Sequence, residues 1–240
     1  MNDSMTTAIS SLWVSVPSDS GAFDAYLVLP PAGHGPGLVL FQEIFGVNAH
    51  IRALAEQYAL DGFVVLAPDV FWRQAPRIEL GYEATDKQQG IALAAALKPE
   101  QVMLDQRAAV AALRALTQVG ERKVGAIGYC MGGRFAYMSA ALAEIDAAVA
   151  YYGGGIHEQL HLVSGVSCPM QFHYAERDEH IPLSAVTRVR EAFAGKACEV
   201  HVYEDTTHGF NCWERASYHP ASAAVAHARA LRFLAGHLFA

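Results

Sequence analysis

Long apolar runs are absent from this 240-residue chain, which excludes one large class of proteins. A membrane-spanning helix needs about 18 or more consecutive apolar residues, whereas the longest apolar runs here, such as 37–41 and 63–67, are short. The opening residues, MNDSMTTAISS, also lack the basic segment, apolar run and cleavage site of a secretory signal. We therefore expect a cytoplasmic protein with no membrane partner.

Basic residues are few and scattered. Lys and Arg total 17 against 24 Asp and Glu, which gives a formal net charge of -7 and a pI near 5.8. Proteins that bind nucleic acid neutralise phosphates with clustered Lys and Arg side chains. The charge pattern therefore predicts that nucleic acid is not a partner.

Cysteine is also scarce, and no two of the four cysteines form a CxxC pair. In a reducing cytoplasm all four are expected to be free thiols. A thiol redox protein would need a resolving cysteine close to its reactive one, and no neighbour in sequence offers this to Cys130. Redox function is thus a weak alternative. The four positions are Cys130, Cys168, Cys198 and Cys212.

Short apolar runs alternate with longer stretches of helical period, which predicts βα units around a mostly parallel sheet with helices on both faces. With 52% hydrophobic residues and no linker, repeat or low-complexity tract, the chain 1–240 is expected to form one α/β domain. Expected strands cover 12–16, 25–29, 37–41, 63–67, 124–127, 147–151, 169–174 and 199–203. Expected helices cover 50–60, 83–97, 100–117, 131–142, 183–194 and 221–239.

A cysteine stands at one of the strand–helix junctions. The segment 123–133 reads KVGAIGYCMGG, in which Gly128, Cys130 and Gly132 form a G-x-C-x-G pattern. This is the arrangement of the α/β-hydrolase nucleophile elbow, where glycines permit a sharp turn that exposes the reactive atom. The following helix start would stabilise a thiolate, and the Met131 N–H could receive an oxyanion. The alternative is that the glycines only allow close packing and that Cys130 fills space.

An acid and a histidine follow the cysteine in the order that α/β-hydrolases use, each after a later predicted strand. Asp178 follows the strand 169–174, and His208 follows the strand 199–203. Asp178 would orient the imidazole of His208, which would act as the base for Cys130. Three nearby acids, Glu176, Glu179 and Asp205, compete with Asp178 for this role.

Several motifs together resemble the dienelactone hydrolase (carboxymethylenebutenolidase) family. They are QEIFGVN at 42–48, PDVFWRQAP at 68–76, GYCMGG at 128–133, YYGGG at 151–155 and HGF at 208–210. In order and spacing the resemblance covers nearly the whole chain from about position 12. It implies an α/β-hydrolase fold that cleaves ester or lactone bonds with no metal or organic cofactor.

The resemblance also implies roles for particular residues. It makes Cys130 the nucleophile, His208 the base and Asp178 its orienting acid. The amides of Ile44 and Met131 become the oxyanion hole.

Two further charged residues gain roles from the same resemblance. Glu43 becomes a catalytic carboxylate that contacts the resting thiol, and Arg73 becomes the partner of a substrate carboxylate. The sequence departs from the family where a second arginine is expected, because Cys212 stands there. Whether Arg215 substitutes is left open.

A competing motif, HEQLH, spans His157 to His161 and matches the zinc-protease pattern H-E-x-x-H. A zinc protease needs this motif inside a substantial helix and a third ligand. Here three glycines precede it, and Gly165 and Pro169 follow soon after, so a short solvated helical turn is expected instead.

The resulting hypothesis is a cysteine-dependent hydrolase that forms a thioacyl intermediate and prefers small anionic lactones or esters. A general small-molecule carboxylesterase is the main alternative, and a non-catalytic binding module with this fold is a remote one. We expect a monomer or a weak homodimer.

Overall fold

The computed structural model describes residues 8–240, which form one eight-stranded sheet with the order β1-β2-β4-β3-β5-β6-β7-β8. Strands β3 to β8 are parallel, and β2 pairs antiparallel with both β1 and β4. The strands are β1 Ser10–Ser18, β2 Gly21–Leu29, β3 Gly37–Phe41, β4 Val64–Pro68, β5 Val124–Tyr129, β6 Ala147–Tyr151, β7 Met170–Ala175 and β8 Cys198–Tyr203.

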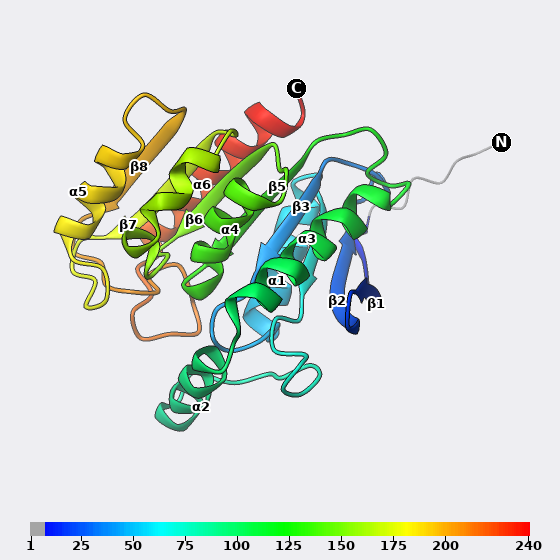
Figure 1. Ribbon diagram of the computed structural model, residues 1–240, viewed down its shortest axis with the longest axis horizontal. Helices are drawn as coiled ribbons and strands as arrows, with labels where there is room; N and C mark the ends of the chain where they lie inside the picture. The colour runs from blue at the N-terminus through cyan, green and yellow to red at the C-terminus, as the bar shows by residue number, and fades with distance from the viewer. Residues whose placement is uncertain (1–7) are drawn as a thin grey trace.

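Helices cover both faces of the sheet (Figure 1). Helices α3 and α4 pack together and against β1, β3 and β5, whereas α1 packs on β2 and β4 and α6 packs on β5, β6 and β7. The helices are α1 Ala49–Leu60, α2 Ala84–Ala95, α3 Pro99–Ala115, α4 Met131–Leu142, α5 Leu183–Ala192 and α6 Pro220–Leu238, with two 3-10 turns, η1 Ile156–Glu158 and η2 Leu160–Gly165. The predicted mostly parallel α/β architecture is confirmed.

The central strands are buried on both faces. Every residue of β3, β4, β5, β6 and β7 is buried. Burial on both faces explains why β3 to β6 read as nearly continuous apolar runs rather than alternating ones, whereas β7 includes the buried polar residues Gln171 and His173. Strands β1 and β2 form an antiparallel hairpin and are longer than the expected strands 12–16 and 25–29, because pairing extends to the Ser18–Gly21 register position. No helix within 8–240 is both long and apolar enough to cross a membrane.

The loops after β3 and β8 gather at one edge of the sheet, at its lower side in Figure 1. Parallel strands all end at the same edge, so the residues that follow them meet there. Helix α2 lies beyond this edge and packs on the loop after β3, since a Cβ at Gly90 would lie 2.4 Å from the carbonyl oxygen of Ile44. This edge carries most of the residues predicted to be functional.

Candidate active site

Cys130 lies in the tight turn between β5 and α4 with φ 55° and ψ -117°, a conformation that few residues other than glycine adopt. Its flanking glycines are required by close backbone contacts. A Cβ at Gly128 would lie 2.0 Å from the carbonyl oxygen of Gly132, and a Cβ at Gly132 would lie 2.2 Å from that of Phe41. The local geometry matches the strained nucleophile elbow that the sequence predicts.

Asp178 and His208 are joined by a hydrogen bond. The His208 Nδ1 lies 2.8 Å from Asp178 Oδ2. The other carboxylate oxygen, Oδ1, accepts from the backbone N–H groups of His180 at 2.8 Å and Ile181 at 3.1 Å. These contacts fix the fully buried carboxylate, so that one oxygen is aimed at the imidazole.

The acids that compete with Asp178 in the sequence are occupied elsewhere or exposed. Glu176 accepts from the backbone N–H of Asp205 at 2.9 Å, and Asp205 pairs with the guanidinium of Arg177. Glu179 is exposed. Among these four carboxylates, Asp178 is the one that contacts His208.

His208 also interacts with the Cys130 thiol. Burial lowers the pKa of His208, but the Cys130 charge and hydrogen bonds to Asp178 and Cys130 outweigh burial and raise that pKa to about 10. The rings of Tyr152 and His180 pack edge-on against the imidazole, with centroids 5.1 Å and 5.2 Å away. This environment favours a protonated imidazole beside Cys130.

Glu43 is a buried carboxylate at the same edge, with 1% of its surface exposed. Its Oε1 lies 3.3 Å from Nη1 of Arg215, and its Oε2 accepts from the Tyr82 hydroxyl at 3.5 Å. Burial raises the pKa of Glu43, and the positive charges of Arg215 and His208 oppose that rise. The protonation state of Glu43 therefore depends on the two cations beside it.

The loop that carries Glu43 is fixed by Gln42, a buried residue to which the sequence gave no separate role. The Gln42 side chain donates to the Glu43 carbonyl at 3.2 Å and accepts from the Val70 N–H at 3.2 Å. Ile44 follows in this loop, and Met131 is the first residue of α4, so its N–H has no partner within the helix. The predicted oxyanion donors thus come from segments held against each other at the ends of β3 and β5.

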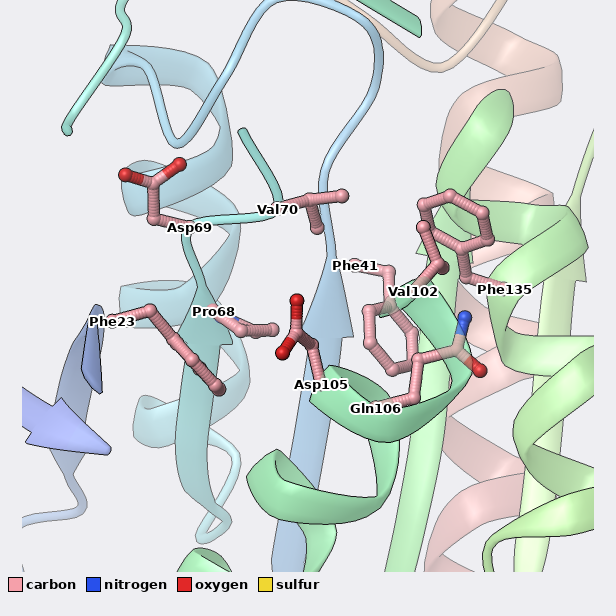
Figure 2. Close-up of a pocket in the computed structure, with 9 residues that line it drawn as sticks. All are labelled: Phe23, Phe41, Pro68, Asp69, Val70, Val102, Asp105, Gln106 and Phe135. Carbon is pink, nitrogen blue, oxygen red and sulfur yellow. The ribbon is translucent and has the colours of Figure 1, made fainter. Parts of the chain in front are cut away.

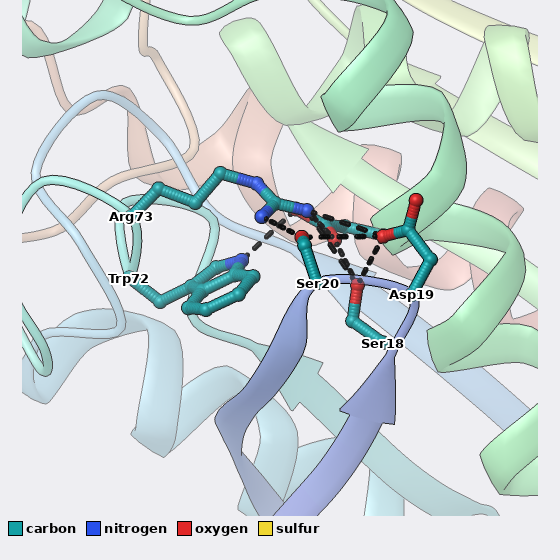
Figure 3. Close-up of polar contacts among 6 residues, drawn as sticks. Ser18, Asp19, Ser20, Trp72 and Arg73 are labelled. Atoms are coloured by element: carbon teal, nitrogen blue, oxygen red, sulfur yellow. Dashed lines mark hydrogen bonds and ion pairs between the residues drawn. The ribbon is translucent and has the colours of Figure 1, made fainter.

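Arg73 is held by other side chains of the protein. Its Nη2 pairs with Asp105 Oδ1 at 2.7 Å, its Nη1 donates to Ser20 Oγ at 2.6 Å, and its guanidinium stacks on Trp72 at 4.2 Å. Figure 3 shows the side chain directed at the turn between β1 and β2, where Ser18 also lies. Asp105 accepts from Ser18 and from the Trp72 indole as well.

The role of Arg73 as the partner of a substrate carboxylate stays a prediction, and in the structure its guanidinium is paired with Asp105. None of the contacts that the structure gives for Arg73 within residues 8–240 reaches Glu43, Cys130 or His208. Its guanidinium forms an ion pair with Asp105, which connects the loop after β4 to α3 and to the β1–β2 hairpin. The arginine that pairs with Glu43 is Arg215.

Arg215 reaches Glu43 from the loop that follows β8. Its guanidinium packs directly over Gly209, where a Cβ would lie 2.3 Å from Nη1, and it lies 5.9 Å from the Phe45 ring. The backbone N–H of Arg215 donates to the carbonyl of Cys212 at 3.1 Å, which turns the chain back toward the site. The sequence places an arginine three positions beyond Cys212. The conformation of the loop is needed to show that its side chain points to Glu43.

A small cavity near the site is too small for a substrate (Figure 2). Its volume is about 10 Å³, which is room for about one water molecule. It lies behind the loop after β4, between β3, α3 and α4. Its lining residues are Phe23, Phe41, Pro68, Asp69, Val70, Val102, Asp105, Gln106 and Phe135.

The HEQLH segment does not form the helix that a zinc protease requires. His157 lies in η1, and His161 lies in η2, with a break at Gln159 between the two short 3-10 helices. An α-helix is needed to place residues i and i+4 on one face, so the motif lacks its metal-binding geometry. The zinc-protease alternative has no support.

Comparison with known proteins identifies the family. The model of the "Dienelactone hydrolase family" matches residues 23–238. The carboxymethylenebutenolidase of Pseudomonas putida is 35% identical over 219 residues, which cover 90% of this chain and 92% of that protein. Carboxymethylenebutenolidase 1 of Cupriavidus pinatubonensis is 34% identical over 225 residues, covering 92% and 95%.

Solved structures agree with the sequence relatives. The crystal structure of a Klebsiella pneumoniae protein ascribed to the dienelactone hydrolases has a TM-score of 0.86 and 30% identity, and the match covers 96% of this chain and 100% of that one. Its α/β-hydrolase fold is the one described above. This chain belongs to the dienelactone hydrolase family and is a hydrolase that acts on ester or lactone bonds.

Proposed function

We propose that this hydrolase works through a Cys130 thiolate and a thioacyl intermediate. The observation that carries the proposal is the arrangement around His208, whose imidazole is fixed by Asp178 and whose pKa is raised to about 10 beside the Cys130 charge. A protonated imidazole next to a thiolate is the resting form that cysteine nucleophiles use. The strained turn at Cys130 supports the same role.

In the first step the Cys130 sulfur forms a bond to the carbonyl carbon, and the oxyanion is held by the Ile44 and Met131 amides. The bond to the alkoxide then breaks, and His208 gives its proton to the leaving oxygen. In the second step His208 takes a proton from water as that water attacks the thioester. The acid product leaves, and the Cys130 thiolate is restored.

The substrate class we propose is small esters or lactones that carry a carboxylate. Arg215, with 18% of its side chain exposed, is the cation beside Glu43 and the predicted nucleophile. An incoming carboxylate would pair with its guanidinium in place of Glu43. Glu43 would then lose its cationic partner, so substrate binding and the charge of Glu43 are coupled.

The first test is alkylation and substitution of Cys130. Burial raises the pKa of the other thiols, to about 11 for Cys168 and about 12 for Cys198 and Cys212, so iodoacetamide at neutral pH should label Cys130 alone. Labelling, and separately Cys130→Ala, are expected to lower kcat for an activated ester by at least ~1,000-fold without a change in Tm. Hydrolysis that persists in Cys130→Ala would reject the assignment.

The substrate proposal is tested on matched pairs of lactones that differ only in a carboxylate, dienelactone among them. We expect a higher kcat/KM for the carboxylate-bearing member of each pair. Equal values would favour the general carboxylesterase, an alternative motivated by Cys212 in place of the family's second arginine.

A third test measures the titration of His208. Because its pKa is raised to about 10, the imidazole should stay protonated at pH 8, about 1.5 units above the usual pKa of histidine. Cys130→Ala removes the largest effect that raises this pKa, so the ring should lose its proton at lower pH. Ring nitrogen NMR shifts recorded from pH 5 to 11 report both values, and identical titrations in the two proteins would contradict the thiolate–imidazolium pair.

A further inference from the structure

Three side chains that commonly bind metals meet beside the proposed catalytic group. Glu43 comes from the loop after β3, His50 from the first turn of α1 and Cys212 from the loop after β8. One potential ligand atom from each lies within 4.8 Å of the other two, and all three residues are buried. The segments are far apart in sequence, so the fold brings together a carboxylate, an imidazole and a thiol.

His50 is the independent sign that this cluster takes a ligand. It is 1% exposed, yet neither ring nitrogen has a hydrogen-bond partner in the described part of the chain. A buried polar group left unpaired costs about 1–3 kcal/mol, and its neighbour Trp213 only packs on the ring, with centroids 4.1 Å apart. The two ring nitrogens are therefore available to a ligand.

We propose that Glu43, His50 and Cys212 bind one divalent ion of the zinc class. The set of oxygen, nitrogen and sulfur donors suits Zn²⁺ and Co²⁺, whereas Mg²⁺ and Ca²⁺ prefer oxygen ligands alone. When the ion binds, the thiol proton of Cys212 leaves to solvent and a sulfur–metal bond forms. The thiolate and the Glu43 carboxylate then balance both positive charges of the ion.

The cluster needs only a small contraction to reach zinc geometry. Bonds of about 2.1 Å to nitrogen and oxygen and about 2.3 Å to sulfur place tetrahedral ligands roughly 3.4–3.7 Å apart. The three ligand atoms, which now lie within 4.8 Å of one another, therefore have to approach one another by about 1 Å. Cys212 can move with its loop, whose next residue, Trp213, is 41% exposed. Three protein ligands leave a fourth position for water.

Two nearby positive charges limit the affinity. Arg215 binds one oxygen of Glu43 at 3.3 Å, and the start of α1, next to His50, carries the positive end of the helix dipole. Both oppose a cation, so binding should be weaker than at a structural zinc site. If the proposed function holds, an ion here also competes with Arg215 for Glu43 and lowers hydrolase activity.

The test uses the full-length Cys130→Ala protein, which removes the predicted nucleophile as a competing metal ligand. Isothermal titration with Zn²⁺ is expected to give one ion per chain, and Mg²⁺ in excess should not displace it. His50→Phe and Cys212→Ser in this background should each weaken binding at least tenfold. The matched control replaces the HEQLH histidines, His157→Gln and His161→Gln, and should leave Zn²⁺ binding unchanged.

A spectroscopic measurement keeps the test valid if a ligand variant unfolds. Co²⁺ bound to Cys130→Ala should show a thiolate-to-metal charge-transfer band, and Cys212→Ser should abolish it, with Tm recorded for every variant. Absence of Zn²⁺ binding, binding that survives His50→Phe and Cys212→Ser, or loss of binding in the HEQLH control would overturn the proposal. Because Zn²⁺ and Co²⁺ binding are measured rather than turnover, these outcomes are independent of the Cys130 mechanism.

Discussion

Arg73 and Arg215 are both paired with a carboxylate and both lie near an aromatic ring, but they belong to different parts of the molecule. Arg73 joins the loop after β4 to the β1–β2 turn and α3 through Asp105, whose side chain is 15% exposed. Arg215 pairs with Glu43, whose side chain is 1% exposed, at the edge of the sheet where the parallel strands end. Arg73 connects three elements of the fold, and Arg215 pairs with a buried carboxylate.

The two carboxylates explain the difference. Asp105 accepts hydrogen bonds from Ser18 and from the Trp72 indole in addition to Arg73, so its charge has several fixed partners. Glu43 has Arg215 at 3.3 Å and a long contact to Tyr82 at 3.5 Å, and burial raises its pKa. A charge with few partners responds strongly when one of them is withdrawn, which suits a site that binds an anion.

The largest effect that this comparison predicts is for Arg215→Ala. Loss of a charge-assisted contact to an anionic substrate is worth about 1.5–3 kcal/mol, so kcat/KM for a carboxylate-bearing ester should fall by roughly 10–150-fold. A neutral ester of the same alcohol should lose less, because it never pairs with the guanidinium. Steady-state kinetics on the two esters give the ratio directly.

Arg73→Ala is the matched control for that measurement. It removes the same charge from a position outside the site, so kcat/KM for both esters should stay within about threefold of the unaltered protein. If Arg73→Ala lowers kcat/KM for the anionic ester selectively and Arg215→Ala does not, the two roles are reversed.

The order of strands made much of the site predictable from sequence. Cys130, Asp178 and His208 each follow a strand that the sequence predicts, and parallel strands end at one edge of the sheet. Short turns then leave these residues little freedom. The elbow glycines added a second constraint, which the contact between Gly128 and Gly132 explains.

The arginines were not predictable in the same way. Arg73 received its role from its position in a motif. Its partner in the structure, Asp105, lies 32 residues away on α3, so no local pattern connects the two. Arg215 lies in a loop without regular structure, where side-chain direction depends on the turn at Cys212 and on the space above Gly209. The meeting of His50 with Cys212 also depends on tertiary packing alone.

The second effect in size is on stability. Arg73→Ala removes a 2.7 Å ion pair, a hydrogen bond to Ser20 and the stacking on Trp72. The guanidinium is partly buried, so the free energy of unfolding should fall by about 1–2 kcal/mol. Urea unfolding of Arg73→Ala and Arg73→Lys measures this, since lysine keeps the charge but loses the planar stacking. No change in either variant would mean that the hairpin and α3 are held together without this contact.

The smallest effect should come from an arginine that makes a similar pair in solvent. Arg77 Nε lies 2.6 Å from Asp24 Oδ2, with 47% and 33% of the two side chains exposed, so water and salt screen the pair. Arg77→Ala should lower the free energy of unfolding by only about 0.2–1 kcal/mol, and by less still in high salt.

Arg77 also has φ 53°, a conformation that glycine adopts without strain. Arg77→Gly should therefore be more stable than Arg77→Ala in urea unfolding. If it is less stable, the positive φ at position 77 does not strain a side chain at this turn.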